Sequence, residues 1–191
     1  MNLQLTRKMI KEIRIIVKRI TKAFWIWAEF SERDHHFLSN IQKPVRSLLN
    51  SPDFDLHLTL AGPFKSINQD AIKNLKEICK RNTSIAIKSL GYEYKESFFE
   101  SFYIAIKNTK ELISLRSNIY EATKSKRSKI FSPHISLSYG DHDNQKKKYL
   151  ISKLPRVISE IKIDKICIVD VNEDIHMWKV IEKINLGYRS Y

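Results

Sequence analysis

The sequence of 191 residues contains little of what fibrous, disulfide-rich or membrane-spanning chains need. Four glycines and five prolines are too few for a collagen-like or low-complexity protein. Two cysteines, Cys79 and Cys167, are too few for a disulfide framework and lack the spacing of metal ligands, which favours a reducing compartment. No apolar run approaches the roughly 20 residues that a membrane-spanning helix needs. We therefore expect a cytoplasmic protein without a transmembrane segment.

Acidic residues are in the minority. The chain has 21 Asp and Glu residues against 34 Lys and Arg residues, which gives a formal net charge of +13. Such an excess favours anionic partners, namely nucleotides, RNA or a membrane surface, and says nothing about the fold. The length suits one domain with a sizeable core, and the 10% aromatic content argues against disorder.

Residues 1–22 differ from the remainder of the chain. They carry seven basic residues against one acid, Glu12, and their apolar residues recur at helical spacing. The segment lacks an uninterrupted hydrophobic stretch and a small-residue cleavage site, so a secretory signal is not expected. Three interpretations stay open: a basic amphipathic helix packed on the domain, an anchor that contacts RNA or another anionic surface, or upstream residues of an over-extended reading frame.

From residue 23 onward, strand and helix patterns alternate without a linker, which predicts a single domain over residues 23–191. The patterns predict strands over residues 23–30, 54–60, 84–94, 98–107, 131–139, 160–171 and 175–186. They predict helices over residues 34–50, with an interruption at Pro44, and over 68–81, 109–126 and 144–154. Each half holds a strand with a His-x-hydroxyl triplet, then a helix, then a hairpin. This duplication predicts a two-lobed, pseudo-symmetric α+β domain with a cleft between the lobes.

The two triplets are His57-Leu58-Thr59 and His134-Ile135-Ser136. Side chains alternate between the faces of a strand, so the histidine and hydroxyl of each triplet share one face while the central residue points into the core. Two such strands side by side would place two imidazoles and two hydroxyls around one small volume.

That combination suits cleavage of a phosphodiester. One imidazole can remove a proton from water, and the second can donate a proton to the leaving oxygen. The hydroxyls can donate hydrogen bonds to the phosphate oxygens, where negative charge accumulates. We expect neither a metal nor another cofactor, because the remaining histidines have no Asp, Glu or Cys at a ligand spacing: His35, His36, His142 and His176.

The segments around the triplets resemble the paired signatures of the 2H phosphoesterase superfamily, and most closely its cyclic phosphodiesterase branch. The matching stretches are Trp25-Ile-Trp27-Ala28 for the first strand, His57-Leu-Thr59-Leu for the first motif, Ser97-Phe98-Phe99 for the central hairpin, Phe131-Ser-Pro-His134-Ile-Ser136-Leu-Ser-Tyr139-Gly for the second motif, and 171–186 with Trp178. The resemblance covers roughly residues 23–187, and residues 1–22 lie outside it.

This resemblance implies the 2H fold, in which antiparallel sheets form a central cleft and helices lie outside. It implies metal-independent hydrolysis of a 2′,3′-cyclic nucleotide, or of ADP-ribose 1″,2″-cyclic phosphate, to a phosphomonoester. His57 and His134 would be the acid–base pair, and Thr59 and Ser136 would hold the phosphate. Because members usually keep the 2′-phosphate, His134 would activate water and His57 would protonate the 3′ oxygen.

Further residues are candidates for substrate contacts, each with a structural alternative. Tyr139 would border the phosphate or the base, but at its odd spacing from His134 it needs a bulge or a strand end to face the same side. Lys65 is a candidate phosphate ligand. Aromatic residues that can stack on a base, or simply belong to the core, are Trp27, Phe64, Phe98 and Phe99. The basic run 124–129 is interpreted as a solvated helix end or as a contact to the phosphate backbone of a longer substrate. Residues 146–148 are predicted to form an exposed helix face.

Two alternatives to the cyclic-phosphate hydrolase remain. The same four residues would serve an enzyme that acts on RNA ends, 2′–5′ linked oligonucleotides or cyclic oligonucleotide signals, and the charge excess favours this alternative. A closed aromatic pocket would favour a mononucleotide, and an open basic trough an oligomer. The third is a catalytically inactive RNA-binding module, although all four motif residues are present. We expect a monomer whose substrate is a nucleotide or an RNA-derived cyclic phosphate.

Overall fold

The computed structural model describes residues 23–126 and 130–187, and the helix expected over residues 1–22 lies outside them. The first half of the chain runs β1 (Ala23–Phe30), α2 (Glu32–Leu49), β2 (Leu58–Phe64), α3 (Gln69–Arg81) and β3 (Ile85–Tyr94). The second half runs β4 (Phe102–Ile106), α4 (Lys110–Ala122), β5 (His134–Ser138), α5 (Asn144–Lys153) and β6 (Glu160–Val171), followed by the short 3-10 helix η1 (Ile175–Met177) and β7 (Lys179–Asn185). The α+β class is confirmed.

The two halves repeat one topology, strand–helix–strand–helix–strand. The strand pairings obey the same symmetry, because β1–β2 corresponds to β4–β5 and β1–β6 corresponds to β4–β3. The remaining contacts, β2–β5 and β3–β6, join equivalent strands of the two halves. All of these pairings are antiparallel and link the strands into one hydrogen-bonded network that closes on itself, with β7 added to β6. The pseudo-symmetry is confirmed, but the predicted repeat was wrong in detail, since the β3–β4 hairpin joins the halves instead of belonging to one.

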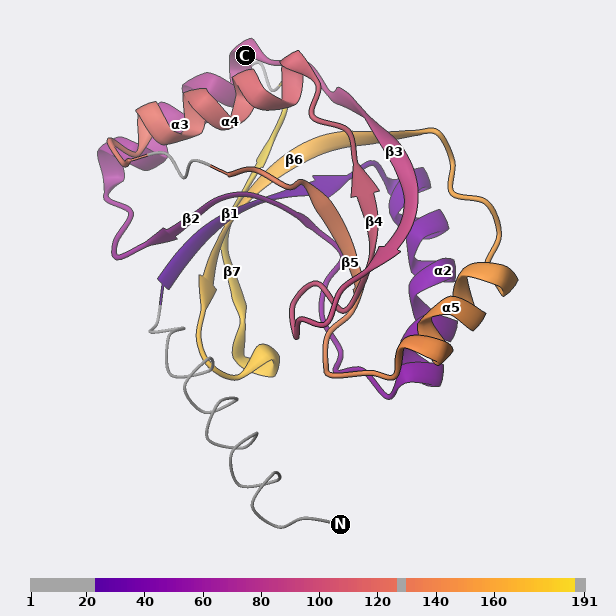
Figure 1. Cartoon of the computed structure of the whole chain (residues 1–191). Coiled ribbons are helices and arrows are strands. Elements are labelled where there is room, and N and C mark those ends of the chain that lie inside the picture. The colour runs from indigo at the N-terminus through magenta and orange to yellow at the C-terminus, as the bar shows by residue number, and fades with distance from the viewer. Residues whose placement is uncertain (1–22, 127–129, 188–191) are drawn as a thin grey trace.

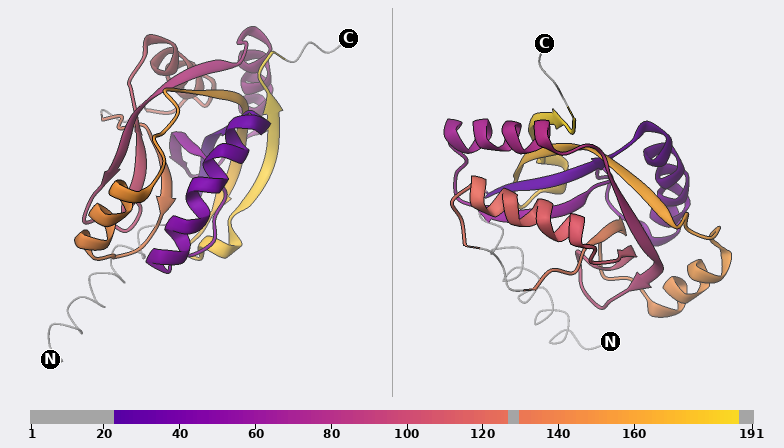
Figure 2. Two further views of the ribbon diagram at one scale, coloured as in Figure 1. Left: turned by 90° about the vertical axis from the view of Figure 1, so that its right-hand side faces the viewer. Right: turned by 90° about the horizontal axis from the view of Figure 1, so that it is seen from above.

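Helices flank the strands on two sides. Figure 1 shows α3 and α4 together on one flank and α2 and α5 on the other, and the view from above in Figure 2 shows the strands between these pairs. Each inner strand carries a helix from the opposite half, since α2 packs on β5 and α4 packs on β2. The apolar core therefore packs against one face of both strands that carry the triplets. Their central residues, Leu58 and Ile135, are fully buried in it.

Several element boundaries differ from the sequence-based expectation. Helix α2 continues through Pro44, because its apolar face, which includes Leu38 and Val45, is buried in the core and outweighs the missing backbone hydrogen bond. Strand β2 begins later than expected and passes through Gly62-Pro63, where the expectation was a stop. Phe54 and Leu56 are buried without belonging to a strand. The alternation of apolar and polar residues in this segment therefore indicated which residues are buried, but not a strand.

Gly62 keeps β2 close to β1. It adopts a φ of +133°, and a Cβ atom at this position would lie 2.7 Å from the ring of Trp25. Only glycine combines that backbone conformation with so close a packing of an indole. The strand can therefore pair with β1 as far as Phe64, with the ring of Trp25 packed closely on Gly62.

Two connections are longer than predicted. Strand β4 begins at Phe102, so a loop over residues 95–101 replaces the three-residue turn that the sequence predicted. The last strand begins at Lys179, because residues 175–177 form η1. Lys147 is a further correction: it was expected on an exposed face of its helix, but it is buried and donates from Nζ to the carbonyl of Lys95 at 3.0 Å.

Candidate active site

The two triplets lie on adjacent antiparallel strands. Leu58 of β2 pairs directly with Ile135 of β5, and these are the central residues of the triplets. This register places His57 beside Ser136 and Thr59 beside His134 on the face opposite the core. Two imidazoles and two hydroxyls therefore share one surface, as the alternation of strand side chains predicts.

The histidines are held in the same way. Nδ1 of His57 lies 2.7 Å from the carbonyl oxygen of Asp55, and Nδ1 of His134 lies 2.8 Å from that of Ser132. A carbonyl oxygen can only accept, so each Nδ1 carries a hydrogen and donates it. Each neutral ring then has an unprotonated Nε2, which is left free to accept a proton from a bound molecule.

The surroundings of the two rings differ. The indole of Trp27 stacks on His57 with ring centroids 3.6 Å apart and an interplanar angle of 9°. The strand register places Tyr103 at the equivalent position of the second half, but its ring is tilted by 58° and lies 5.2 Å from that of His134. Burial, together with the charge of His134, lowers the pKa of His57 from 6.5 to about 4 against the effect of its bond to Asp55. His57 is therefore a neutral ring at pH 7.

A cleft of about 240 Å³ opens in front of these groups. Its walls are aromatic, and the ring of Trp178 lies edge-on to Trp27, His57 and Tyr139 and parallel to Phe99. The residues that line it are Trp25, Trp27, His57, Thr59, Phe99, Glu100, His134, Ser136, Tyr139, Val171 and Trp178. A flat apolar group such as a nucleobase can stack in such a cleft beside the polar groups of the triplets.

Tyr139 reaches the cleft because β5 ends at Ser138. Beyond the strand end, the backbone N–H of Tyr139 donates to Oγ of Ser51 at 2.9 Å, and the buried ring stacks on Phe54. Burial raises the pKa of Tyr139, and its hydrogen bond with Ser136 opposes that rise. The phenol is therefore protonated and can donate a hydrogen bond. The strand end that the sequence required for this residue is present.

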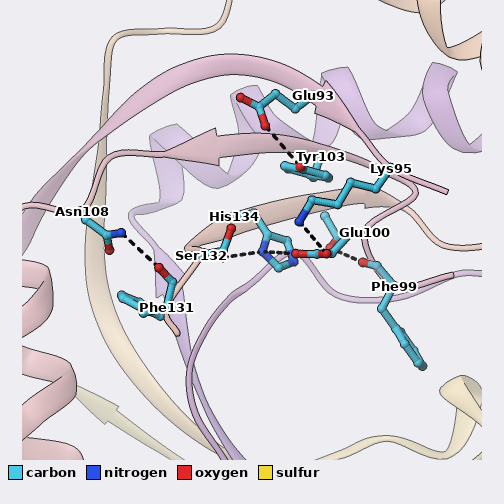
Figure 3. A network of polar contacts seen from close by, with 10 residues as sticks. Glu93, Lys95, Phe99, Glu100, Tyr103, Asn108, Phe131, Ser132 and His134 are labelled. Carbon is cyan, nitrogen blue, oxygen red and sulfur yellow. Dashed lines mark hydrogen bonds and ion pairs between the residues drawn. The ribbon is translucent and has the colours of Figure 1, made fainter. Parts of the chain in front are cut away.

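The loop over residues 95–101 brings polar groups to the second triplet (Figure 3). The carbonyl of Phe99 accepts a hydrogen bond from Oγ of Ser136 at 3.2 Å. The carboxylate of Glu100 lies 3.8 Å from Nδ1 of His134 and forms an ion pair with Nζ of Lys95 at 2.7 Å. This loop therefore orients a motif hydroxyl and brings a charged group to the cleft.

The structure gathers most of the residues that the sequence singled out. The seven that line the cleft are His57, Thr59, His134, Ser136, Tyr139, Trp27 and Phe99. Phe98 does not line it but packs against Phe99 and Tyr139 at its edge. Phe64 and Lys65 lie elsewhere, on a second hollow beside α4, because β2 carries them past the end of the cleft.

Four lining residues were not among the sequence-based candidates: Trp25, Glu100, Val171 and Trp178. Trp178 comes from the β6–β7 connection, where its Nε1 donates to the carbonyl of Asn172 at 2.9 Å. One signal was available, because all three tryptophans of the chain line this cleft. Glu100 carried no signal, since an isolated acid in a predicted strand looks like any surface residue.

Two searches of the described residues gave negative results. Within residues 23–126 and 130–187, no group of three or more His, Cys, Asp or Glu side chains has the arrangement of a metal site. In the same part of the chain, no helix is long and apolar enough to cross a membrane.

Comparison with known proteins identifies the family. Residues 41–175, which include both triplets, match the model of the 2′-5′ RNA ligase superfamily. The chain belongs to this superfamily. The 2H phosphoesterase resemblance seen in the sequence is thereby confirmed at the level of the superfamily.

Solved structures of other proteins share the fold at low sequence identity. The protein TT0787 of Thermus thermophilus is 16% identical, with a TM-score of 0.58 over 87% of this chain and 98% of that chain. E. coli LigT complexed with 3′-AMP is 12% identical, with a TM-score of 0.57 over 87% of this chain and 99% of that chain. E. coli LigT complexed with NADP+ is 13% identical, with a TM-score of 0.54 over 87% and 99% of the two chains. No curated protein matches this sequence.

Proposed function

We propose that this member of the superfamily is a phosphodiesterase that hydrolyses a nucleoside 2′,3′-cyclic phosphate to a phosphomonoester. The observation that carries the proposal is the pairing of Leu58 with Ile135, which brings two matched His-x-hydroxyl triplets to one cleft. Both rings are oriented by a backbone carbonyl and leave Nε2 for the substrate. The complex of LigT with 3′-AMP supports a nucleotide ligand in this fold.

The reaction needs one water and two proton transfers. The oxygen of water attacks phosphorus while Nε2 of one histidine takes the proton that water loses. The bond from phosphorus to one sugar oxygen breaks, and the second histidine donates its proton to that oxygen. Thr59 and Ser136 donate hydrogen bonds to the remaining phosphate oxygens as charge builds on them, and Ser136 gives up its bond to Phe99 to do so.

The environments of the two rings favour one assignment of roles. His57 is neutral in the free enzyme, because its pKa of about 4 lies far below 7, and a neutral imidazole accepts a proton. His134 lies beside Glu100, whose carboxylate can form an ion pair with the protonated ring. These features favour His57 as the base and His134 as the acid, the reverse of the roles that the family resemblance implies.

The size and walls of the cleft support a small substrate. Its volume of about 240 Å³ lies below the roughly 300–1,000 Å³ of typical ligand pockets and suits one nucleotide. A small cleft with aromatic walls and no Lys or Arg among its described lining residues is closer to the pocket expected for a mononucleotide. The alternative substrates, RNA ends and 2′–5′ linked or cyclic oligonucleotides, would instead need an open basic trough.

The first test is a product assay. Purified protein in EDTA is given 2′,3′-cyclic AMP, and the products are separated by chromatography. We expect turnover without added metal, since the four side chains supply the proton transfers and the phosphate contacts. His57→Ala and His134→Ala should each lower turnover by at least ~10²-fold. His36→Ala, which changes an exposed histidine of α2 outside the cleft lining, serves as the control.

The product also assigns the two roles. In the binding orientation that the resemblance implies, 3′-AMP makes His57 the base and 2′-AMP makes His134 the base. Full activity in either His57→Ala or His134→Ala would refute the two-histidine mechanism. Activity that disappears in EDTA and returns with a divalent cation would refute its independence of metal.

A further inference from the structure

The described wall of the cleft has an unusual charge for a site that binds phosphate. None of its lining residues is Lys or Arg, and Glu100 is its only carboxylate. The motif hydroxyls and the imidazoles are thus the groups that meet the reacting phosphate. A second phosphate on the same ligand would find no fixed cation in this wall.

Glu100 is held firmly at its position. One carboxylate oxygen bonds to Nζ of Lys95 at 2.7 Å, and the backbone N–H of Lys95 donates to the carbonyl of Glu100 at 3.0 Å. Lys147, buried beneath the loop, donates to the carbonyl of Lys95. Figure 3 shows Lys95 and His134 both reaching the carboxylate of Glu100. The carboxylate is therefore tethered beside the catalytic face, and the ammonium of Lys95 is engaged in holding it.

We propose that Glu100 is a specificity-determining residue that confines the cleft to nucleotides whose only phosphate is the reacting one. This inference rests on the proposed function and names its substrate class, which is nucleoside 2′,3′-cyclic phosphates with a free 5′-hydroxyl. Ligands with additional phosphates, such as ADP-ribose cyclic phosphate or a 5′-phosphorylated RNA fragment, are disfavoured.

The physical reason is the desolvation of charge. A phosphate that enters a small apolar cleft loses its hydration, and the loss is recovered only where donors or cations replace the water. Thr59, Ser136 and the histidines do this for one phosphate. A further phosphate loses hydration without such compensation and is repelled by Glu100, so discrimination comes from a repulsive element.

The net charge of the chain does not contradict this selectivity. Other described basic residues lie away from the cleft, for example Arg81, Lys88, Lys107 and Lys110 around a hollow beside the start of α4. Their field attracts anions over a distance, whereas selection occurs against the groups in direct contact with the ligand. A basic protein can therefore have a cleft that rejects polyanions.

The test measures binding through intrinsic fluorescence. All three tryptophans line the cleft, so quenching reports its occupancy directly. The probes are adenosine 3′-monophosphate and adenosine 3′,5′-bisphosphate, which differ by one phosphate. The full-length chain should bind the bisphosphate at least ~10-fold more weakly, and Glu100→Gln should narrow this ratio at least ~5-fold. Glu100→Asp, which keeps the charge, should retain the discrimination.

Glu96→Gln is the matched control, because Glu96 is an exposed carboxylate of the same loop that bonds to Asn144 and does not line the cleft. Equal affinity of the wild-type chain for both probes, or an equal effect of Glu96→Gln and Glu100→Gln, would overturn the inference. So would the absence of quenching by either probe. Since binding needs no turnover, a protein that discriminates but does not hydrolyse cyclic AMP contradicts only the proposed function. An active enzyme without discrimination contradicts only this inference.

Discussion

At the scale of single residues, the two halves of the site differ through the aromatic residue that faces each histidine. Trp27 covers His57, whereas the smaller and tilted Tyr103 leaves His134 more exposed. The backbone contacts of the two rings are the same, so the difference in burial comes from the aromatic rings around them, Trp27 and Trp178 at His57 and Tyr103 at His134. Pseudo-symmetric strands thus give two imidazoles of unlike character, which suits a reaction that needs one base and one acid.

His57 should make the stability of the protein depend on pH. Its pKa is about 4 in the native state, so between pH 6.5 and 4 the unfolded chain binds a proton that the native chain does not. The free energy of unfolding should fall in this window as the pH decreases, with a slope that approaches about 1.4 kcal/mol per pH unit. Urea unfolding at several pH values measures it.

The variant His57→Asn should lose this part of the pH dependence, whatever its stability at pH 7. His36→Asn, which changes an exposed histidine of α2, should retain the wild-type slope. Parallel stability curves for the wild type and His57→Asn would show that His57 titrates normally and would contradict its assignment as a neutral, buried ring.

At the scale of elements, the first turn of α2 is tied to the middle of the sheet. Asp34 is buried, and its carboxylate accepts hydrogen bonds from the backbone N–H of Lys162 at 2.7 Å and from Nε of Arg33 at 3.1 Å. Burial alone would raise the pKa of Asp34, but these hydrogen bonds and that from Ser31 outweigh it, so the pKa is lowered. Helix α2 packs on β5, so this contact fixes a support of the second triplet.

Replacement of Asp34 tests that link. Asp34→Ala removes the buried carboxylate that accepts from the N–H of Lys162 and should lower the free energy of unfolding by about 1–3 kcal/mol at pH 7. Glu32→Ala, which removes an exposed acid from the same turn, should change it by less than about 0.5 kcal/mol. The pKa of Asp34 is depressed in the native state, so its contribution should be lost in strong acid as the carboxylate becomes protonated. Chemical denaturation at pH 7 and pH 3 measures both effects, and equal losses in the two variants would contradict the tie.

At the scale of the whole molecule, the repeated strands and the connections that are not repeated contribute different parts of the cleft. The repeated strands β2 and β5, together with His57 directly before β2, supply the four polar groups of the proposed catalytic face. Part of the wall comes from connections that the repeat does not generate, namely the loop before β4 with Phe99 and Glu100 and the β6–β7 connection with Trp178. Under the proposed function, chemistry would depend on the duplicated core, and ligand selection would depend in part on these connections.

Removal of residues 1–22 tests whether residues 23–191 are sufficient for the proposed hydrolysis. Every lining residue of the cleft lies between Trp25 and Trp178, and β1 begins at Ala23. The shortened chain should therefore hydrolyse 2′,3′-cyclic AMP with a kcat/KM within about threefold of the full-length value. Loss of the seven basic residues should weaken binding to RNA or anionic vesicles at low salt. A loss of hydrolysis well beyond threefold would show that the segment contributes to the site.

Much of the candidate site was predictable, because strand alternation is a local property. The spacing of His57 and Thr59, and of His134 and Ser136, placed each pair on one face, and the neighbouring Leu58 and Ile135 marked the buried face. Boundaries such as the start of β2 were less accessible, since buried residues alternate in irregular segments as well as in strands. The path of α2 through Pro44 was decided by packing against the core, which local propensity does not contain.

The residue types, their spacing and the charge of this protein follow from the chain alone, and so does the chemistry that the two triplets can perform. The pairing of Leu58 with Ile135, the cover of Trp27 over one histidine, and the completion of the cleft by Glu100 and Trp178 arise only when the chain folds. The reason is that these contacts join segments far apart in the chain, through strand register and loop packing. Short-range sequence patterns determine which residues of a helix or strand face the core. Which elements then pack against one another depends on how the chain as a whole buries its apolar surface.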